Sequence, residues 1–377
     1  MLMTFTHFYC NCIFWEQKEL GQLGKVAMNK RVFKDQTSET GEVPFFKIGT
    51  FGKEPDSFIT KELFEEYKNK YPFPNVGDIL ISASGSIGRL VVYQGKNEYF
   101  QDSNIVWLDH NGKIDNLFLK QFYSIVNWKG LEGTTIKRLY NKDILKTKIV
   151  LPNLVEQKQV GKFFDLLEKL ITLYQRKKDC LDQLYKGLLE YLTENYDEMS
   201  TFRIGELFEE RDERTSNREL LSVTISSGVV PFNTINKTDN SSDDKSRYKC
   251  VEKNDIVYNS MRMWQGASGL SNYTGIVSPA YTVLKPRENV NPAYISKVFK
   301  KRTIINFFTR FSQGLTSDTW NLKYNQIKDI NISLPSNNAQ KEIISVLSSI
   351  EKIKKEVNNK GNTFNKLKKS YLDKLFL

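Results

Sequence analysis

The stretch "LPNLVEQKQVGKFFDLLEKLI" at residues 151–171 returns, 183 residues later, as "LPSNNAQKEIISVLSSIEKI" at residues 334–353. Both versions open with Leu-Pro and carry Gln-Lys at the same place. From Val160 and Ile343 onward, an apolar residue recurs every seven positions through five heptads. This spacing is typical of a helix that packs along another helix in a coiled coil. The sequence therefore predicts two long helices built to one plan.

The seam between these helices is expected to contain five residues of each copy. They are Val160, Leu167, Tyr174, Leu181 and Leu188, and Ile343, Ile350, Val357, Phe364 and Tyr371. A second apolar row, starting at Phe163 and Val346, is expected to complete the seam. Lys177 and Lys360 interrupt that row at matching places. Each lysine either lays its aliphatic stem along the seam or marks a place where a partner docks.

The repeat extends beyond the helices, with "LGQL" at 20–23 matched by "IGEL" at 204–207 and "GDIL" at 77–80 matched by "NDIV" at 254–257. The spacing between matched segments drifts within each half but returns to 183 at the helices. This drift indicates two variable domains, each followed by a conserved helix. The expected division is 1–14 as a lead outside the repeat, 15–150 as domain one, 151–198 as the first helix, 199–334 as domain two and 335–377 as the second helix.

Both domains are rich in strand signals punctuated by glycine, as in "GDILISASGSIGRLVVY" from residue 77. We expect α+β domains with a curled antiparallel sheet, and short helices at 116–126 and 292–307. To bury its heptad face, the second helix must run back along the first, because the ends of domain two are expected to lie close together. About 37 residues at about 1.5 Å each give a helix of about 55 Å. The predicted architecture is two related domains separated by a long antiparallel coiled coil, with a pseudo-twofold internal repeat.

Composition narrows the classes of partner. The formal net charge is +11, with 40% hydrophobic and 26% charged residues, which is typical of a globular protein that binds a polyanion such as DNA. Four cysteines and two histidines are not spaced for a disulfide framework or a zinc site. The sparse cysteines indicate a reducing, cytoplasmic compartment. No apolar run is long enough to span a membrane, so we expect no membrane contact.

The pattern "GDILIS-x-SGSIG", then "G-TT", then "LP-L-EQ" opening a long helix, with the unit repeated, resembles the specificity subunit of type I restriction–modification enzymes. The second copy departs from it at Ala339, where the pattern has Glu. The resemblance covers residues from about 15 to 377. It implies a subunit without catalytic activity that binds no cofactor, whose two target-recognition domains each read one half of a bipartite double-stranded DNA site. It also implies two adenine-N6 methyltransferase subunits that use S-adenosylmethionine, and restriction subunits that use ATP and Mg²⁺.

Base reading in the major groove needs polar and basic side chains on loops held by a rigid sheet. Four segments provide them, and hydrogen bonding within a turn is the alternative role for each residue. The candidates are Ser82, Ser84, Ser86 and Arg89; Thr134, Thr135, Lys137 and Arg138; Asn259, Arg262, Trp264 and Gln265; and Gln313, Thr316 and Ser317. The segment "KKRTIINFFTR" at 300–310 either grips phosphates or forms an amphipathic helix with a solvated basic face.

Three motifs resemble catalytic sites but have simpler interpretations. "NPAY" at 291–294 is similar to a methyltransferase motif, but Asn291 and Pro292 suit the start of a helix. "EEYK" at 65–68 lies in a helix-like run rather than on a strand, and "SGSIGR" lacks the Gly-Lys-Ser of a phosphate loop. The remaining alternatives are a specificity subunit of another methylation-based defence system, a self-contained DNA-modifying enzyme and a two-module scaffold.

Overall fold

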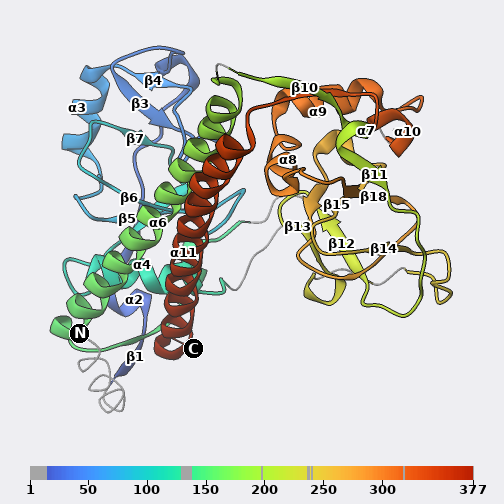
Figure 1. The fold of residues 1–377 in the computed structure, drawn as a ribbon. Coiled ribbons are helices and arrows are strands. Elements are labelled where there is room, and N and C mark those ends of the chain that lie inside the picture. The colour runs from blue at the N-terminus through green and yellow to red at the C-terminus, as the bar shows by residue number, and fades with distance from the viewer. Residues whose placement is uncertain are drawn as a thin grey trace. The chain divides into compact units, whose positions relative to one another are not determined.

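The computed structural model describes residues 15–128, 138–196, 198–235, 238, 241–316 and 319–376 (Figure 1). These residues form two compact units. Unit 1 contains the described residues up to Gln175 together with those from Asn359 onward, and unit 2 is Arg176–Asn358. Each unit therefore includes one part of each long helix. The predicted lead at residues 1–14 lies outside the described residues.

The two heptad-bearing segments are single continuous helices, α6 (Leu154–Glu194) and α11 (Asn337–Phe376). The Oδ1 atom of Asn153 accepts hydrogen bonds from the backbone N–H groups of Val155 and Glu156, which caps the start of α6. At 41 and 40 residues the helices are slightly longer than expected. Among the described residues, no helix is both long enough and apolar enough to cross a membrane.

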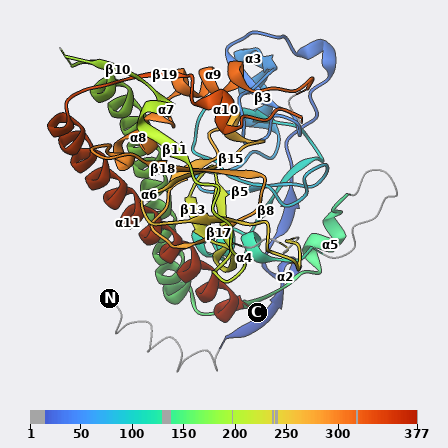
Figure 2. The ribbon, with the colours of Figure 1, turned by 45° about the vertical axis from the view of Figure 1, so that its right-hand side comes forward.

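Within each unit the two helices run antiparallel and side by side (Figures 1 and 2). In unit 1, Tyr174 packs on Phe364 with ring centroids 5.4 Å apart, and Phe163 packs on Tyr371 at 5.7 Å. In unit 2, Lys354 pairs with Asp182 at 2.6 Å. The ten residues of the expected seam are all buried or half-buried.

The second row of the seam differs from the expectation by one residue. Leu184, Val346, Ile353 and Leu367, which continue the expected row, are 48%, 46%, 45% and 36% exposed. Phe163, the first residue of the expected row, is half-buried and packs on Tyr371. The row that faces inward along both helices lies one position later and contains Phe164, Ile171, Lys178, Tyr185 and Leu192, and Leu347, Lys354, Gly361, Lys368 and Leu375. Lys354 and Lys368 can lie there because carboxylates of α6 pair with them. Lys177 and Lys360 are exposed and do not interrupt the seam.

Unit 1 is built around a four-stranded antiparallel sheet in the order β2-β8-β5-β6. A second sheet, β4-β3-β7, includes a parallel pair in which Phe45 lies opposite Tyr99. Strands β1 and β9 pair antiparallel, so the two ends of the domain meet. The bounds are β1 Glu16–Glu19, α2 Leu20–Leu23, β2 Lys25–Ala27, β3 Val43–Phe46, β4 Phe58–Ile59, α3 Lys61–Lys70, β5 Ile79–Ser82, β6 Leu90–Val92, β7 Tyr99–Phe100, β8 Ile105–Asp109, α4 Asn116–Ile125, α5 Asn141–Leu145 and β9 Lys148–Leu151.

Unit 2 repeats this plan with the sheet β11-β18-β15-β16 and the terminal pair β10–β19. Here too the ends of the domain meet, as expected from the chain direction, because Ser200 lies opposite Leu334. The bounds are β10 Ser200–Arg203, α7 Ile204–Leu207, β11 Phe208–Glu210, β12 Leu221–Thr224, β13 Gly228–Pro231, β14 Lys249–Val251, β15 Ile256–Asn259, η4 Met263–Gln265, β16 Ser268–Leu270, β17 Gly275–Val277, β18 Tyr281–Pro286, α8 Pro292–Val298, α9 Arg302–Phe311, α10 Tyr324–Ile327 and β19 Asn331–Leu334.

The short helices match the expectation in unit 1 and differ in unit 2. Helix α4 occupies Asn116–Ile125, close to the predicted 116–126. The single helix predicted at 292–307 is two helices, α8 and α9. They separate because Lys301 has extended backbone angles and serves as the N-cap residue of α9.

In both units a carboxylate on a long helix connects the domain to the helix pair. In unit 1, Glu168 accepts hydrogen bonds from the Nζ atoms of Lys120 on α4 at 2.5 Å and of Lys368 on α11 at 2.6 Å. In unit 2, Glu351 accepts from Lys297 on α8 at 2.5 Å and from the Tyr185 hydroxyl at 2.8 Å. The repeat therefore preserves the junction even though the donors differ.

The long helices also belong to the hydrophobic core of each unit. In unit 1, Val160 and Phe164 of α6 pack in one cluster with Phe118 of α4. Gly161 permits this close approach, because a Cβ atom there would lie 2.8 Å from the Leu117 Cβ. In unit 2, Ile343 of α11 packs in one cluster with domain residues. The helices are thus part of each folded unit.

Candidate nucleic-acid interface

In each unit, a backbone hydrogen bond joins two segments that are far apart in the sequence. One is the loop after a central strand of the sheet, β5 or β15, and the other follows the second candidate segment of that unit. In unit 1 the N–H of Leu139 donates to the carbonyl of Ala83 at 2.8 Å. In unit 2 the N–H of Leu322 donates to the carbonyl of Ser260, also at 2.8 Å. The structure therefore brings together, within each unit, the candidate segments that are far apart in the sequence.

Several unit 1 candidates hold the loop in shape. The Ser82 side chain is fully buried, and its hydroxyl donates to the Ser86 carbonyl at 2.5 Å and accepts from the Arg89 N–H at 2.8 Å. Ser82 is therefore removed from the set of base-reading residues. Ser84 is half-buried and donates to Asn104 Oδ1 at 2.8 Å. The Ser86 side chain is exposed at the tip of the loop.

The two arginines of the unit 1 set are both half-buried. Arg89 donates through Nη1 to the Phe51 carbonyl at 2.6 Å, and Arg138 donates through Nη2 to the Ser103 carbonyl at 3.1 Å. Each guanidinium carries further N–H groups that can donate to a ligand. The remaining candidates of this unit, Thr134, Thr135 and Lys137, lie outside the described residues.

The unit 2 candidates are more accessible. Arg262, Gln313 and Thr316 are exposed, while Asn259 and Gln265 are half-buried. The Asn259 Oδ1 accepts from the N–H of Met261, which shapes the turn into η4. Ser317 lies outside the described residues.

An aromatic pair joins the two unit 2 loops. Trp264 lies edge-to-face against Trp320, with ring centroids 5.3 Å apart, and donates its indole N–H to the Met261 carbonyl at 3.1 Å. The rings fix the relative positions of the loops on either side of them. Around them, Met261 is 46% exposed and Leu315 is fully exposed, and the sequence analysis identified neither residue.

The basic segment 300–310 divides into internal and exposed residues. Lys301 is 6% exposed and pairs with Glu194 at 2.9 Å, and Lys300 donates to backbone carbonyls. Arg302 and Arg310 are exposed on α9, which buries Ile304 and Phe308 and is therefore amphipathic. Two of the four basic side chains are thus available to an external anion.

The sequence analysis also missed the turn between β12 and β13. Ile225 in this turn is 53% exposed, and Ser226 and Ser227 are exposed beside it. Gly228 follows with a φ of +65°, a conformation that favours glycine. The run "TISSGVV", with serines and glycine between apolar strand residues, is the signal that could have identified this turn.

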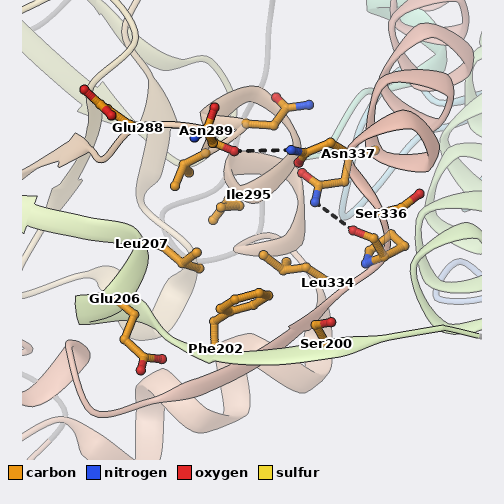
Figure 3. A pocket seen from close by; sticks show the side chains of 14 residues that line it. Ser200, Phe202, Glu206, Leu207, Glu288, Asn289, Ile295, Leu334, Ser336 and Asn337 are labelled. Carbon is orange, nitrogen blue, oxygen red and sulfur yellow. Dashed lines mark hydrogen bonds between the residues drawn. The ribbon is translucent and has the colours of Figure 1, made fainter.

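A pocket of about 570 Å³ lies in unit 2 at the start of α11 (Figure 3). Phe202, Leu207 and Leu334 line its apolar side, and Asn337 Nδ2 donates to the Asn289 carbonyl at 3.4 Å across it. Gln340 also lines this pocket and is 4% exposed.

The glutamine that opens each long helix is used differently in the two copies. Both Gln157 and Gln340 donate to a proline carbonyl at 2.9 Å. The Gln157 Oε1 also accepts from the N–H of Asp115 at 2.9 Å, whereas the Gln340 Oε1 has no hydrogen-bond partner. The repeat thus preserves the glutamine but completes its hydrogen bonding in only one copy.

The motifs that resembled catalytic sites have structural roles. The Asn291 side chain accepts from the Tyr294 N–H and caps α8, with Pro292 at the first helical position, as the sequence predicted. Residues 65–68 lie within helix α3, also as predicted.

The family model for the type I restriction modification DNA specificity domain matches residues 14–183 and again 196–363. A putative type I restriction enzyme specificity subunit of Haemophilus influenzae is 54% identical over 153 residues, which is 40% of this chain and 40% of that protein. A putative MjaX specificity subunit of Methanocaldococcus jannaschii is 28% identical over 211 residues, 52% of this chain and 49% of that protein. The chain thus matches half or less of the length of these relatives.

Solved structures share the fold. The S subunit of a type I restriction–modification system from M. genitalium matches with a TM-score of 0.61 at 15% identity, over 96% of both chains. A chain from a structure described as showing complex assembly and conformational transition of the type I R-M system matches with a TM-score of 0.53 at 12% identity, over 96% of this chain and 97% of that one. With two family domains, the predicted α+β fold and these structural neighbours, the chain belongs to the type I restriction–modification specificity subunits.

Proposed function

We propose that each unit reads one half of a bipartite, asymmetric site in double-stranded DNA. Both units hold two polar loops together through the same backbone hydrogen bond, between Leu139 and Ala83 and between Leu322 and Ser260. The side chains on these loops differ: when Ala83 is matched with Ser260, Arg262 and Trp264 of unit 2 correspond to Gly85 and Ile87 of unit 1. A shared backbone with different side chains supports the reading of two different base sequences.

The chain is proposed to act without catalysis of its own. The Asn-Pro-Ala-Tyr motif caps a helix, and the Glu-Glu-Tyr-Lys motif lies on a helix face. Methyl transfer would then belong to partner subunits that use S-adenosylmethionine, and cleavage to restriction subunits that use ATP and Mg²⁺.

The long helices are proposed to dock two methyltransferase subunits. Leu184 on α6 and Leu367 on α11 occupy equivalent positions of the repeat, and both are exposed although they are large and apolar. Val346 and Ile353 continue the same row on α11 and are also exposed. Exposed apolar rows of this kind are typical of surfaces that bind another protein. Leu184 and Leu367, at equivalent positions of the two copies, suit two copies of one partner.

The observation that carries the proposal is the repeated pair of reading loops. It is tested by long-read sequencing of N6-methyladenine in cells that express this chain with a type I methyltransferase subunit. We expect a methylated motif with two defined halves and a fixed gap. If the subunits co-purify but no motif is methylated, the chain is a scaffold and DNA reading is wrong.

A domain exchange tests whether the two units read independently. Residues 199–334 would be replaced by the matching domain of another member of the family. We expect a new motif in which one half is changed and the other half is preserved. A change in both halves would contradict reading by separate units.

A further inference from the structure

Lys300 makes an unusual set of contacts at the junction between α8 and α9 in unit 2. Its Nζ donates to the carbonyl oxygens of Gly266 at 2.6 Å and Ser268 at 2.7 Å, and lies 3.4 Å from the carbonyl of Ile225. All three acceptors are backbone carbonyls, so the lysine holds the main chain in place and does not depend on another side chain. Its neighbour Lys301, by contrast, pairs with carboxylates.

The three carbonyls belong to segments that surround the unit 2 reading loops. Gly266 ends η4, the turn that carries Trp264, and has a φ of +79°. A Cβ atom at Gly266 would lie 3.1 Å from Ile305 on α9, so the turn rests directly on this helix. Ile225 belongs to the exposed turn between β12 and β13. One ammonium group therefore contacts both the reading turn and this neighbouring turn.

We propose that Lys300 is a positioning residue that fixes the η4 turn and the β12–β13 turn in one arrangement, and that it thereby sets the base specificity of unit 2. The inference rests on the proposed function, because it presumes that these turns read DNA. It also adds Ile225 and the two serines that follow it to the surface that faces the DNA.

The protonation of Lys300 decides how many carbonyls it can hold. Burial, together with the smaller effect of the positive charge of Lys297 on α8, lowers the pKa of Lys300 to about 8. The protonated amine has three N–H donors for three carbonyls, whereas the neutral amine has two. The end of η4, strand β16 and the β12–β13 turn present the carbonyl groups of Gly266, Ser268 and Ile225 to the amine. Above a pH of about 8, the longest contact, to Ile225, is therefore the one expected to be lost.

This loss can be distinguished from unfolding. Because the pKa of Lys300 is lower in the folded than in the unfolded chain, the unfolded chain binds more protons between about pH 8 and 10.5. The contribution of this group to stability therefore rises, rather than falls, across that range. A decline in DNA discrimination above pH 8 would reflect release of the turn.

The test uses the full chain in complex with its methyltransferase subunits and duplexes carrying the motif found by methylation sequencing. Lys300→Met removes all donors, Lys300→Arg keeps the charge, and Lys301→Met is a matched control with the same charge change at a buried neighbour. For Lys300→Met we expect discrimination in the unit 2 half to fall about tenfold, which one good base contact supplies, with the unit 1 half unchanged. Lys301→Met should keep discrimination in both halves even if it lowers thermal stability.

The pH dependence supplies the second measurement. Wild-type discrimination in the unit 2 half should weaken between pH 7 and 9, whereas Lys300→Arg should stay flat because arginine remains protonated. In the DNA-free chain, fluorescence of Trp264 should shift over the same range in wild type and not in Lys300→Arg, with Trp264→Phe identifying the signal. Unchanged discrimination in Lys300→Met, or equal pH profiles of wild type and Lys300→Arg, would overturn the inference while leaving the proposed function intact. A wild-type complex with no preference for either half would overturn both.

Discussion

Replacing Glu168 with glutamine tests how firmly unit 1 is joined to its helix pair. The variant leaves the ammonium groups of Lys120 and Lys368 without their shared counter-charge. A hydrogen bond to a charged group contributes about 1.5–3 kcal/mol, and breaking a fully buried ion pair costs about 3–5 kcal/mol. The Glu168 side chain is 24% exposed, so we expect a loss toward the lower end of these ranges, about 2–3 kcal/mol.

The effect should depend on pH in a defined direction. Burial alone would raise the pKa of Glu168, but the hydrogen bonds and charges of Lys120 and Lys368 outweigh it and hold the pKa below its usual range. A carboxylate with a lowered pKa contributes stability that is complete above its unfolded pKa, about 4.3, and is lost as the pH falls through its folded pKa. The difference between wild type and Glu168→Gln should therefore be constant from about pH 5.5 to 8 and shrink in stronger acid.

Thermal and urea unfolding of the full chain measure this loss, with Glu351→Gln as the matched control. Glu351 is 41% exposed and is bound by one lysine and one tyrosine, so its loss should be less than half as large. For Glu168→Gln we expect the unit 1 transition to fall by about 5 °C at pH 7. Equal losses in the two variants, or a Glu168→Gln deficit that does not shrink as the pH falls below about 4, would refute the reasoning.

Further substitutions test other features of the structure. Gln157→Leu should lower the unfolding midpoint more than Gln340→Leu in thermal denaturation, because only Gln157 uses its side-chain oxygen; the reverse order would contradict this. Leu167→Asp places a charge in the buried seam and should unfold unit 1, as circular dichroism would show. Ile353→Asp lies on the exposed row and should keep the melting temperature but lose co-purification of the methyltransferase subunit; retained co-purification would refute docking there. Arg262→Ala should reduce discrimination in the unit 2 half by about 1–3 kcal/mol in DNA-binding titrations, and a uniform loss over all sequences would indicate a phosphate contact instead.

The long helices could be predicted from the sequence because a heptad repeat depends on local spacing alone. The first row of the seam, through Leu167 and Ile343, is buried as such a pattern requires. The second row could not be assigned, because hydropathy favours Leu184 over its neighbour Tyr185. In the structure Tyr185 faces inward and donates to Glu351, which is 166 residues away in the sequence. A partner at that distance leaves no mark in a local pattern.

The candidate site shows the same division between local and distant information. The sequence identified the loops, since serine, glycine and arginine after a buried strand are local features. It could not distinguish Ser82, which is fully buried and bonds within its turn, from Ser86, which is exposed four residues later. It singled out the segment that contains Lys300 but could not assign this lysine its contacts, because the acceptors are backbone carbonyls and therefore independent of residue type.

The two copies of the repeat differ in which features they preserve. The backbone bond between the loops, the paired terminal strands and the carboxylate junction recur in both units, and each depends on main-chain geometry or on a single charge. The side chains on the loops do not recur. Among the contacts described above, the contact of Lys300 with backbone carbonyls has no counterpart in unit 1. Under the proposed function, loop residues and the residues that position them could therefore be exchanged without disturbing the frame that places the loops. This arrangement predicts that specificity changes will concentrate in the loops and their supports, while a substitution at Glu168 or Glu351 will change the stability of its own unit without changing the motif.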